Sequence, residues 1–306
     1  MKKAFAFTLK GKYAHFKKPE YNLLGKKNPG HIFLTFGQAH KPFLLGLFGS
    51  VLGINGRDNL FKIKSQKLSG KGAGDIEYYE KLKHLKVSVI PKPLFSVFGG
   101  GGKKTVRRGN ESAFEIMPHN FLHSSGLATG KGQTLMLREY LLKDPEWLII
   151  VASEEENDTL YDELRSRIIK KESVFLPYLG KNELFAEMEF ISDAEDSDDA
   201  FLCYDSFGLS KDDYIEEEQI PYGLFCTKDD FYQDGIKIYR EVLPYKLNKE
   251  GRYEYNLFYS VKKVDNCRLK VESVGKENLE NFYFVKFETI ETPEEGNSGY
   301  FPLYFF

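Results

Sequence analysis

The stretch that decides the fold begins at Trp147-Leu148-Ile149-Ile150-Val151-Ala152 and ends near residue 191. Its first six residues are continuously apolar, which is typical of a buried strand. Asp158 or Thr159 can cap a helix after this strand. The apolar residues of that helix lie on one face: Leu160, Leu164, Ile168 and Ile169. A turn at residues 177–183 then leads into a second strand at 184–191. The stretch therefore predicts strand, helix and strand.

The chain before residue 147 supplies the other half of a repeated pattern. Residues 4–9 alternate as in a half-buried strand, with Phe5 and Phe7 as core residues. A helix begins near Pro42 and ends at Gly53, and its three glycines predict a backbone, that of the sheet, packed closely against it. A short helix at 77–85 and a strand at 87–90 follow. Without the basic, glycine-rich residues 94–132, which predict an inserted arm, the order is strand, helix, strand, strand, helix, strand. This is the ferredoxin-like order of RNA-binding RRM domains, so we expect an α+β fold.

The chain after residue 192 differs in composition. Residues 193–218 carry eleven Asp and Glu against one lysine, and we place the domain boundary there. Four strands are expected beyond it, at 236–242, 253–261, 269–274 and 282–287. The aromatic residues 301–306 must dock on another surface. We therefore predict a palm with its arm over residues 1–192, and an acidic linker with a C-terminal β-rich domain over 193–306.

Charge is divided unequally along the chain. Residues 1–150 contain 25 Lys and Arg against 10 Asp and Glu, a balance of +15, whereas residues 151–306 contain 18 against 35, a balance of −17. Cationic side chains release counterions when they meet phosphates, so the basic half predicts a polyanionic partner, and we expect RNA. The competing interpretation is that these are ordinary surface lysines. It is less favourable because the cationic residues are concentrated in glycine- and lysine-rich loops.

Several classes of protein are disfavoured by the sequence. The three cysteines are far apart and form no C-x-x-C pair, which argues against a zinc ribbon or a disulfide framework and fits a reducing cytoplasm. No apolar run is long enough to span a bilayer. No phosphate-binding loop of the GxxxxGK[ST] type and no catalytic serine elbow occur. We predict no cofactor, no metal ion and no membrane partner.

The candidate RNA contacts fall into three groups. The basic arm is expected to contact phosphates through Lys103, Lys104, Arg107, Arg108 and Lys131. The palm contributes Lys10, Lys12, His15, Lys17, Lys41 and Arg138. In the 177–183 turn, Gly180 lets the backbone approach the RNA, beside Tyr178 and Lys181.

Three segments carry a resemblance to a known family. Residues 7–16 (FTLKGKYAHF), 42–53 (PFLLGLFGSVLG) and 174–183 (VFLPYLGKNE) occur in that order, and Arg138-Glu139-Tyr140-Leu141 stands before a strand. The chain over about 190 residues resembles the Cas-five subunits of type I CRISPR surveillance complexes, with the type I-B branch nearest. Gln38-Ala39-His40-Lys41 replaces the Ser/Thr-rich turn often found before the first helix.

The resemblance implies a fold and a role. The fold would be that of the RAMP superfamily: a ferredoxin-like palm, a basic β-rich thumb and a C-terminal β extension. The protein would be a non-catalytic subunit of the Cascade complex that caps the 5′ handle of the CRISPR RNA (crRNA). Its neighbours would be the Cas-seven backbone and the Cas-eight large subunit, with target DNA contacted only indirectly.

Two other functions remain open. One branch of the family cleaves precursor crRNA without metal, using a tyrosine, a lysine and a histidine. The candidates here are Lys12, Tyr13, His15 and the pair His40 and Lys41, because such a reaction needs a base near the 2′-OH and a cation near the phosphate. The second is a protein-only assembly module whose acidic half docks on a basic partner.

Overall fold

The computed structural model describes residues 1–19, 31–56, 76–92, 95–98, 104–108, 113–123, 135–197, 200–204, 210, 212–216, 219–231, 233, 237–248, 251–261, 267–291 and 300–306. The chain is mixed α and β, and its sheets are mostly antiparallel, as the sequence predicts at that level. None of the described helices has the length and apolarity needed to cross a membrane.

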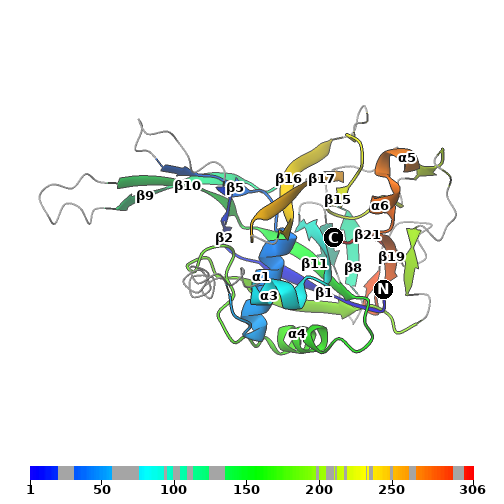
Figure 1. The fold of residues 1–306 in the computed structure, drawn as a ribbon, viewed down its shortest axis with the longest axis horizontal. Coiled ribbons are helices and arrows are strands. Elements are labelled where there is room, and N and C mark those ends of the chain that lie inside the picture. Colours follow the sequence, from blue (N-terminus) through cyan, green and yellow to red (C-terminus); the bar gives the residue numbers. More distant parts are fainter. Residues whose placement is uncertain are drawn as a thin grey trace, which may run out of the picture.

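A four-stranded antiparallel sheet forms the centre of the molecule (Figure 1). Its strands, in spatial order, are β12 (Glu187–Asp193), β1 (Lys3–Lys10), β11 (Glu146–Ser153) and β6 (Lys86–Pro91). The central pair β1 and β11 runs in register from Lys3 opposite Ser153 to Lys10 opposite Glu146. A continuous apolar sequence in β11 fits this position, because a central strand is covered on both faces.

Three helices lie between these strands in the sequence: α1 (Lys41–Leu52), α3 (Glu77–Leu82) and α4 (Thr159–Lys170). As predicted, α1 carries a proline in its first turn and ends at Gly53, whose φ of 76° is left-handed. The N-cap of α4 is Asp158, whose carboxylate accepts the backbone N–H of Tyr161 at 3.0 Å.

The glycines of α1 accommodate a tyrosine of α3 rather than the sheet. A Cβ at Gly49 would lie 2.8 Å from the Cβ of Tyr78, and one at Gly46 would lie 3.7 Å from the ring of the same residue. The prediction of close packing is correct, but the neighbour is a side chain on the adjacent helix.

The two faces of the central sheet are covered by different material. The helical face carries Phe5 and Phe7, which contact Tyr161 of α4 and Phe48 of α1 with ring centroids 5.2 and 6.2 Å apart. The opposite face carries Ala4, Ala6, Leu148, Ile150 and Ala152, which share a buried cluster with C-terminal residues. The expectation that β1 is half-buried is therefore wrong, because both of its faces are covered.

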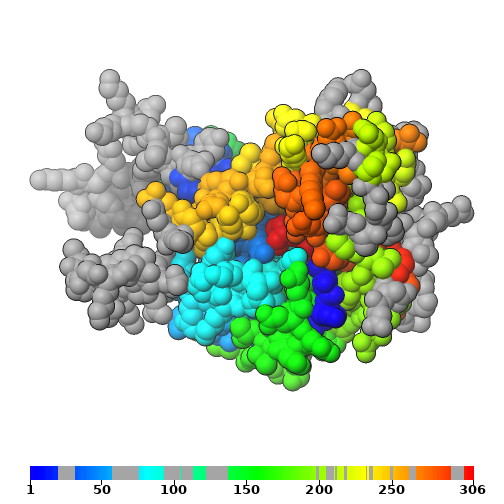
Figure 2. Space-filling model, turned by 45° about the vertical axis from the view of Figure 1, so that its right-hand side comes forward, coloured from blue at the N-terminus to red at the C-terminus, as the bar shows by residue number. Residues whose placement is uncertain are grey.

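The C-terminal strands that cover this second face are β19 (Phe282–Lys286) and β21 (Tyr300–Tyr304), which pair with each other and with β13 (Phe201–Cys203). Phe301 and Phe305 are buried there, so the aromatic tail docks as expected. Phe306 and Val87 exchange backbone hydrogen bonds of 3.1 and 3.0 Å at the edge of β6. Hydrophobic packing thus crosses the predicted boundary at residues 192/193. In Figure 2 the C-terminal residues, orange and yellow, lie directly against the cyan residues near 76–92.

The predicted basic arm contains parts of two different hairpins. In the first, β7 (Phe95–Phe98) pairs with β8 (Lys104–Arg108), which also pairs with β20 (Ile290–Glu291) of the C-terminal half. In the second, β9 (Ile116–His123) pairs with β10 (Leu135–Lys143) and extends away from the body (Figure 1). The short strands β2 (Tyr13–Ala14) and β4 (His31–Phe33) pair with β10, and β3 (Phe16–Lys17) pairs with β5 (Thr35–Phe36).

The remaining C-terminal elements include a long hairpin of β16 (Ile238–Leu247) and β17 (Tyr253–Val261). β15 (Phe225–Cys226) pairs with β17 as a third strand. β14 (Tyr214–Ile215) pairs with β18 (Leu269–Lys270), and α6 (Lys276–Leu279) follows. The strand expected at 269–274 is only partly correct, because Val271–Val274 forms the short helix α5.

Candidate nucleic-acid interface

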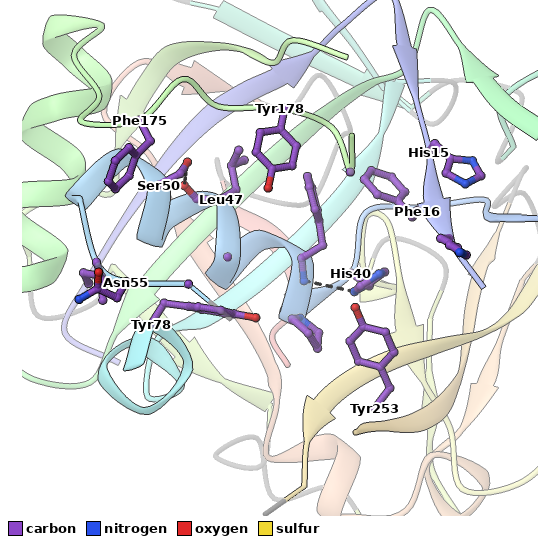
Figure 3. A pocket seen from close by; sticks show the side chains of 17 residues that line it. His15, Phe16, His40, Leu47, Ser50, Asn55, Tyr78, Phe175, Tyr178 and Tyr253 are labelled. Carbon is purple, nitrogen blue, oxygen red and sulfur yellow. Dashed lines mark hydrogen bonds between the residues drawn. The ribbon is translucent and has the colours of Figure 1, made fainter. Parts of the chain in front are cut away.

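A groove of about 640 Å³ lies along α1 and is lined by aromatic side chains. Six of its lining residues are aromatic: Phe16, Phe43, Tyr78, Phe175, Tyr178 and Tyr253. In Figure 3, Phe175 and Tyr178 stand on one side of α1, and Tyr78 and Tyr253 stand on the other. Because Gly46 has no side chain, this part of α1 exposes backbone to the groove.

One wall of the groove is a loop whose apolar side chains are exposed although its backbone is fixed. The backbone N–H groups of Val174 and Phe175 donate to the carbonyls of Val51 and Ser50 at 3.1 and 3.0 Å, which ties the loop to the end of α1. Phe175 is nevertheless 55% exposed and Tyr178 is 40% exposed. Exposed aromatic rings on a rigid loop are typical of a binding surface.

The opposite wall comes from the C-terminal half, which the sequence analysis missed. Tyr253 of β17 lies beside His40, with ring centroids 5.6 Å apart. The hairpin is held by Glu241, whose carboxylate accepts the Gly37 N–H at 2.9 Å and pairs with Lys18 at 2.7 Å. The sequence offers no local signal for Tyr253, because the hairpin reaches the groove only through these long-range contacts.

The 177–183 turn forms the end of the groove next to the β9–β10 hairpin. Gly180 has a φ of 88°, and a Cβ there would lie 2.1 Å from the His15 carbonyl oxygen. The adjacent His15 N–H donates to the Leu179 carbonyl at 3.0 Å. Glycine is required at this position because the turn packs on residues 14–16. Close approach of RNA to Gly180 remains a prediction.

The predicted cations of the palm are dispersed, and two of them, Lys10 and Lys12, pair with acidic side chains. Lys17 lines the groove, and its ammonium lies 4.2 Å from the centroid of the Phe33 ring. Lys10 pairs with Glu187 at 3.5 Å, and Lys12 pairs with Asp144 at 2.8 Å. Arg138 is exposed on the β9–β10 hairpin and donates to Asn120 at 3.0 Å.

Lys181 and Lys41 occupy less accessible positions than the sequence suggests. Lys181 pairs with Glu139 at 2.7 Å and with Glu183 at 2.8 Å. Lys41 is half-buried in the first turn of α1 and is not among the lining residues. Burial, and then the charge of Lys86, lowers the pKa of Lys41 to about 8.

The predicted cations of the basic arm are only partly described. Lys104 is half-buried in β8, and its backbone N–H donates to the Thr289 carbonyl at 2.7 Å. Arg107 and Arg108 are in the same strand, but their side chains lie outside the described residues, as do Lys103 and Lys131 entirely. RNA contacts by this group remain predictions.

The candidate catalytic histidines are both buried. His15 is 2% exposed, its Nδ1 lies 2.9 Å from the Tyr140 carbonyl oxygen, and its ring points away from the groove in Figure 3. Burial lowers the pKa of His15. His40 is the N-cap of α1, and its Nδ1 accepts the Phe43 N–H at 3.3 Å. In these positions both histidines contact groups of the fold itself. A general base in RNA cleavage would instead need to reach the 2′-OH of the substrate.

No metal centre is formed by the described residues, among which no group of three or more His, Cys, Asp or Glu side chains is arranged to hold an ion.

Lys12 lies over the ring of half-buried Tyr13 at 5.9 Å. Among the described residues that line it, the groove offers aromatic rings, exposed backbone and one lysine, Lys17, to a ligand.

Comparisons with known proteins give similarity only at the level of structure. No protein-family model matches the chain, and no curated protein matches it. A solved structure of a Cas protein is 12% identical, with a TM-score of 0.40, over 86% of this chain and 96% of that chain. A CRISPR RNA-guided surveillance complex contains a chain that is 13% identical, with a TM-score of 0.39, over 84% of this chain and 89% of that chain.

A third structure, of a CRISPR-associated protein, is 14% identical with a TM-score of 0.28, over 62% of this chain and 66% of that chain. At these identities and TM-scores the structures differ widely from this chain. The proposal below therefore rests on the residues of this chain.

Proposed function

We propose that this chain is an RNA-binding subunit of a CRISPR RNA-guided complex, with a ferredoxin-like palm of the RAMP type. The sheet order β12-β1-β11-β6, with α1 and α3 before β6 and α4 before β12, supports the palm assignment. The resemblance of residues 7–16, 42–53 and 174–183 to the Cas-five family supports the assignment to type I, with type I-B nearest.

The observation that carries the proposal is the aromatic groove along α1. Single-stranded nucleic acid is commonly held by aromatic rings on which bases stack, together with cations that follow the phosphates. Phe175 and Tyr178 supply exposed rings, Lys17 supplies a charge, and Gly46 leaves room for a strand to approach. An RRM domain uses its open sheet face for RNA, whereas the corresponding face here is filled by β19 and β21.

Within this proposal, the groove holds the 5′ handle of the crRNA. The subunit would be non-catalytic, since His15 and His40 are buried, and it would be assembled with a Cas-seven backbone subunit and a Cas-eight large subunit. Target DNA would be contacted only through the assembly. Endoribonuclease activity is separated from this role by incubation with repeat RNA in EDTA, in which we expect no cleavage.

The deciding experiment measures binding of a fluorescent single-stranded repeat RNA by the chain, alone and co-expressed with its partner subunits. We expect Phe175→Ala and Tyr178→Ala each to weaken binding about 5- to 160-fold, because loss of one stacking platform removes roughly 1–3 kcal/mol. Phe185→Ala is the matched control, because Phe185 is 57% exposed but does not line the groove.

Equal losses for Phe175→Ala and Phe185→Ala would reject the groove as the interface. Complete absence of RNA, both from the isolated chain and from the assembled complex, would reject the proposed function and favour the protein-only assembly module.

A further inference from the structure

The 177–183 turn is joined to both strands of the β9–β10 hairpin by one side chain. The Lys181 ammonium lies 2.7 Å from the Glu139 carboxylate on β10 and 4.8 Å from the centroid of the Phe121 ring on β9. It also lies 2.8 Å from the carboxylate of Glu183 in its own turn. A single cation therefore connects the hairpin to a turn that belongs to the palm.

Glu139 is the one acidic residue in the sequence of the hairpin, 116–143, and it is only 7% exposed. A buried carboxylate requires a counter-ion and hydrogen bonds, since its desolvation is otherwise uncompensated. Lys181 supplies both, through a hydrogen bond from its Nζ to Glu139 Oε2. The hairpin is thus stabilised in the orientation that brings Glu139 to Lys181.

The charges around Lys181 leave little attraction for a further anion. Burial acts against the charged ammonium, but hydrogen bonds to Glu139 and Glu183 outweigh it, and the pKa of Lys181 is raised. One lysine and two glutamates carry a formal local charge of −1. A phosphate approaching Lys181 would therefore meet two carboxylates as well as the ammonium.

The turn that presents Lys181 is itself anchored on the palm. Leu179 accepts a backbone hydrogen bond from His15 at 3.0 Å and donates one to Leu184 at 2.7 Å. A Cβ at Gly11 would lie 2.6 Å from the Leu179 side chain, so the residue that follows β1 is in close contact with the turn. The ammonium is held at a fixed place relative to the groove.

We propose that Lys181 is a positioning residue, which sets the orientation of the β9–β10 hairpin relative to the groove through Glu139 and does not itself contact RNA phosphate. This inference rests on the proposed function for its consequence in RNA binding. Its structural part, the coupling of turn and hairpin, stands independently of RNA.

The test compares Lys181→Met, Glu139→Gln and the double variant for binding of the fluorescent repeat RNA over a range of salt concentrations. Positioning predicts at least fivefold weaker binding for each single variant, no further loss in the double variant and an unchanged salt slope. A direct phosphate contact predicts that Lys181→Met lowers the log–log salt slope by about 1. It also predicts that Glu139→Gln, which removes one of the two carboxylates beside the ammonium, tightens binding. Either of these two outcomes overturns the proposal.

A second measurement does not involve RNA. Amide hydrogen exchange of the free protein should rise at residues 137–141 of β10 in Lys181→Met and stay near the wild-type level in Lys181→Arg. Lys12→Met is the matched control, because the Lys12–Asp144 pair also lies at the base of the hairpin but is exposed.

Unchanged exchange in Lys181→Met overturns the coupling even if RNA binds. Raised exchange in a protein that binds no RNA keeps the coupling and rejects the proposed function instead.

Discussion

The two faces of the central sheet are filled by different kinds of side chain. The face toward α1 and α4 carries large residues such as Phe5, Phe7 and Trp147, all fully buried. The face toward β19 and β21 carries three alanines and four aliphatic side chains, without an aromatic ring from the sheet strands: Ala4, Ala6, Ala152, Ile90, Leu148, Ile150 and Ile191. The alanines leave space on the sheet for large rings from the C-terminal half. Phe301 and Phe287 are two of these rings, and their centroids are 5.6 Å apart.

The difference teaches where a ligand can bind. Because the chain covers both faces of its own sheet, neither face is open to a ligand, and the interface proposed for RNA lies outside the sheet. The groove meets this requirement, since it is built by the outer side of α1 together with the loop at 174–178 and the β16–β17 hairpin. Each prediction below perturbs the layer that covers one of the two faces.

The largest effect is expected on the face covered by the C-terminal strands. Phe301→Ala should lower the free energy of unfolding by about 3–5 kcal/mol, because it removes a buried ring from the cluster that joins residues on both sides of position 192. Urea denaturation followed by tryptophan fluorescence measures the change, and Trp147 reports on the central sheet. Tyr214→Ala, at an exposed position of the same half, is the control.

If Phe301→Ala left the transition reported by Trp147 unmoved, the two halves would be energetically independent and the comparison of faces would lose its basis.

An intermediate effect, dependent on pH, is expected on the helical side. The pKa of Lys41 is lowered to about 8 by burial and by Lys86, whereas a lysine in the unfolded chain titrates near 10.5. Below pH 8 Lys41 is charged in both the folded and the unfolded state, and burial of the charge destabilises the folded state. Between pH 8 and about 10.5 only the unfolded state keeps the proton, so stability contributed by this group rises with pH.

Lys41→Met should therefore raise the free energy of unfolding at pH 7 by about 2 kcal/mol, below the full conversion of the pKa difference because water reaches part of the side chain. It should also remove the rise between pH 8 and 10, which urea denaturation at four pH values would detect. Lys17→Met, at an exposed position, is the control. A stability profile that is identical in wild type and Lys41→Met would contradict the assigned burial.

The smallest effect is expected from the two glycines of α1. Gly49→Ala should cost about 1 kcal/mol, because its Cβ would lie 2.8 Å from Tyr78 and the clash outweighs the gain in helix propensity. Gly46→Ala meets only ordinary contacts at 3.7 Å and should raise stability by about 0.5–1 kcal/mol. Thermal unfolding ranks the two variants, and the reverse ranking would mean that α1 and α3 pack differently.

The strands and helices of the central sheet and its helical layer could be predicted from sequence because their signals are local. The apolar run of β11, the alternation of β1 and the Asp158 cap of α4 each depend on neighbouring residues. The helix at 271–274 was not predictable, because Val271–Val274 has the composition of a strand and only its surroundings make it helical.

The candidate site was less predictable because its contacts join distant residues. The sequence reveals that Lys181 is a cation, but not that Glu139, 42 positions earlier, is its partner. The same applies to Tyr253, which lines the groove. Its hairpin is held there by the hydrogen bond from Gly37 to Glu241, two residues that are 204 positions apart. Counting charges along the chain therefore overestimates how many lysines are available to a polyanion.

The contribution of Tyr253 also has a consequence for the order of events during biosynthesis. Phe16 and His40 leave the ribosome more than 200 residues before the tyrosine that completes the groove with them. At elongation rates of about 5–20 residues per second, this delay is on the order of ten to fifty seconds. A nascent chain that lacks Tyr253 has an incomplete groove, so under the proposed function we expect guide RNA to bind only after β17 has been translated.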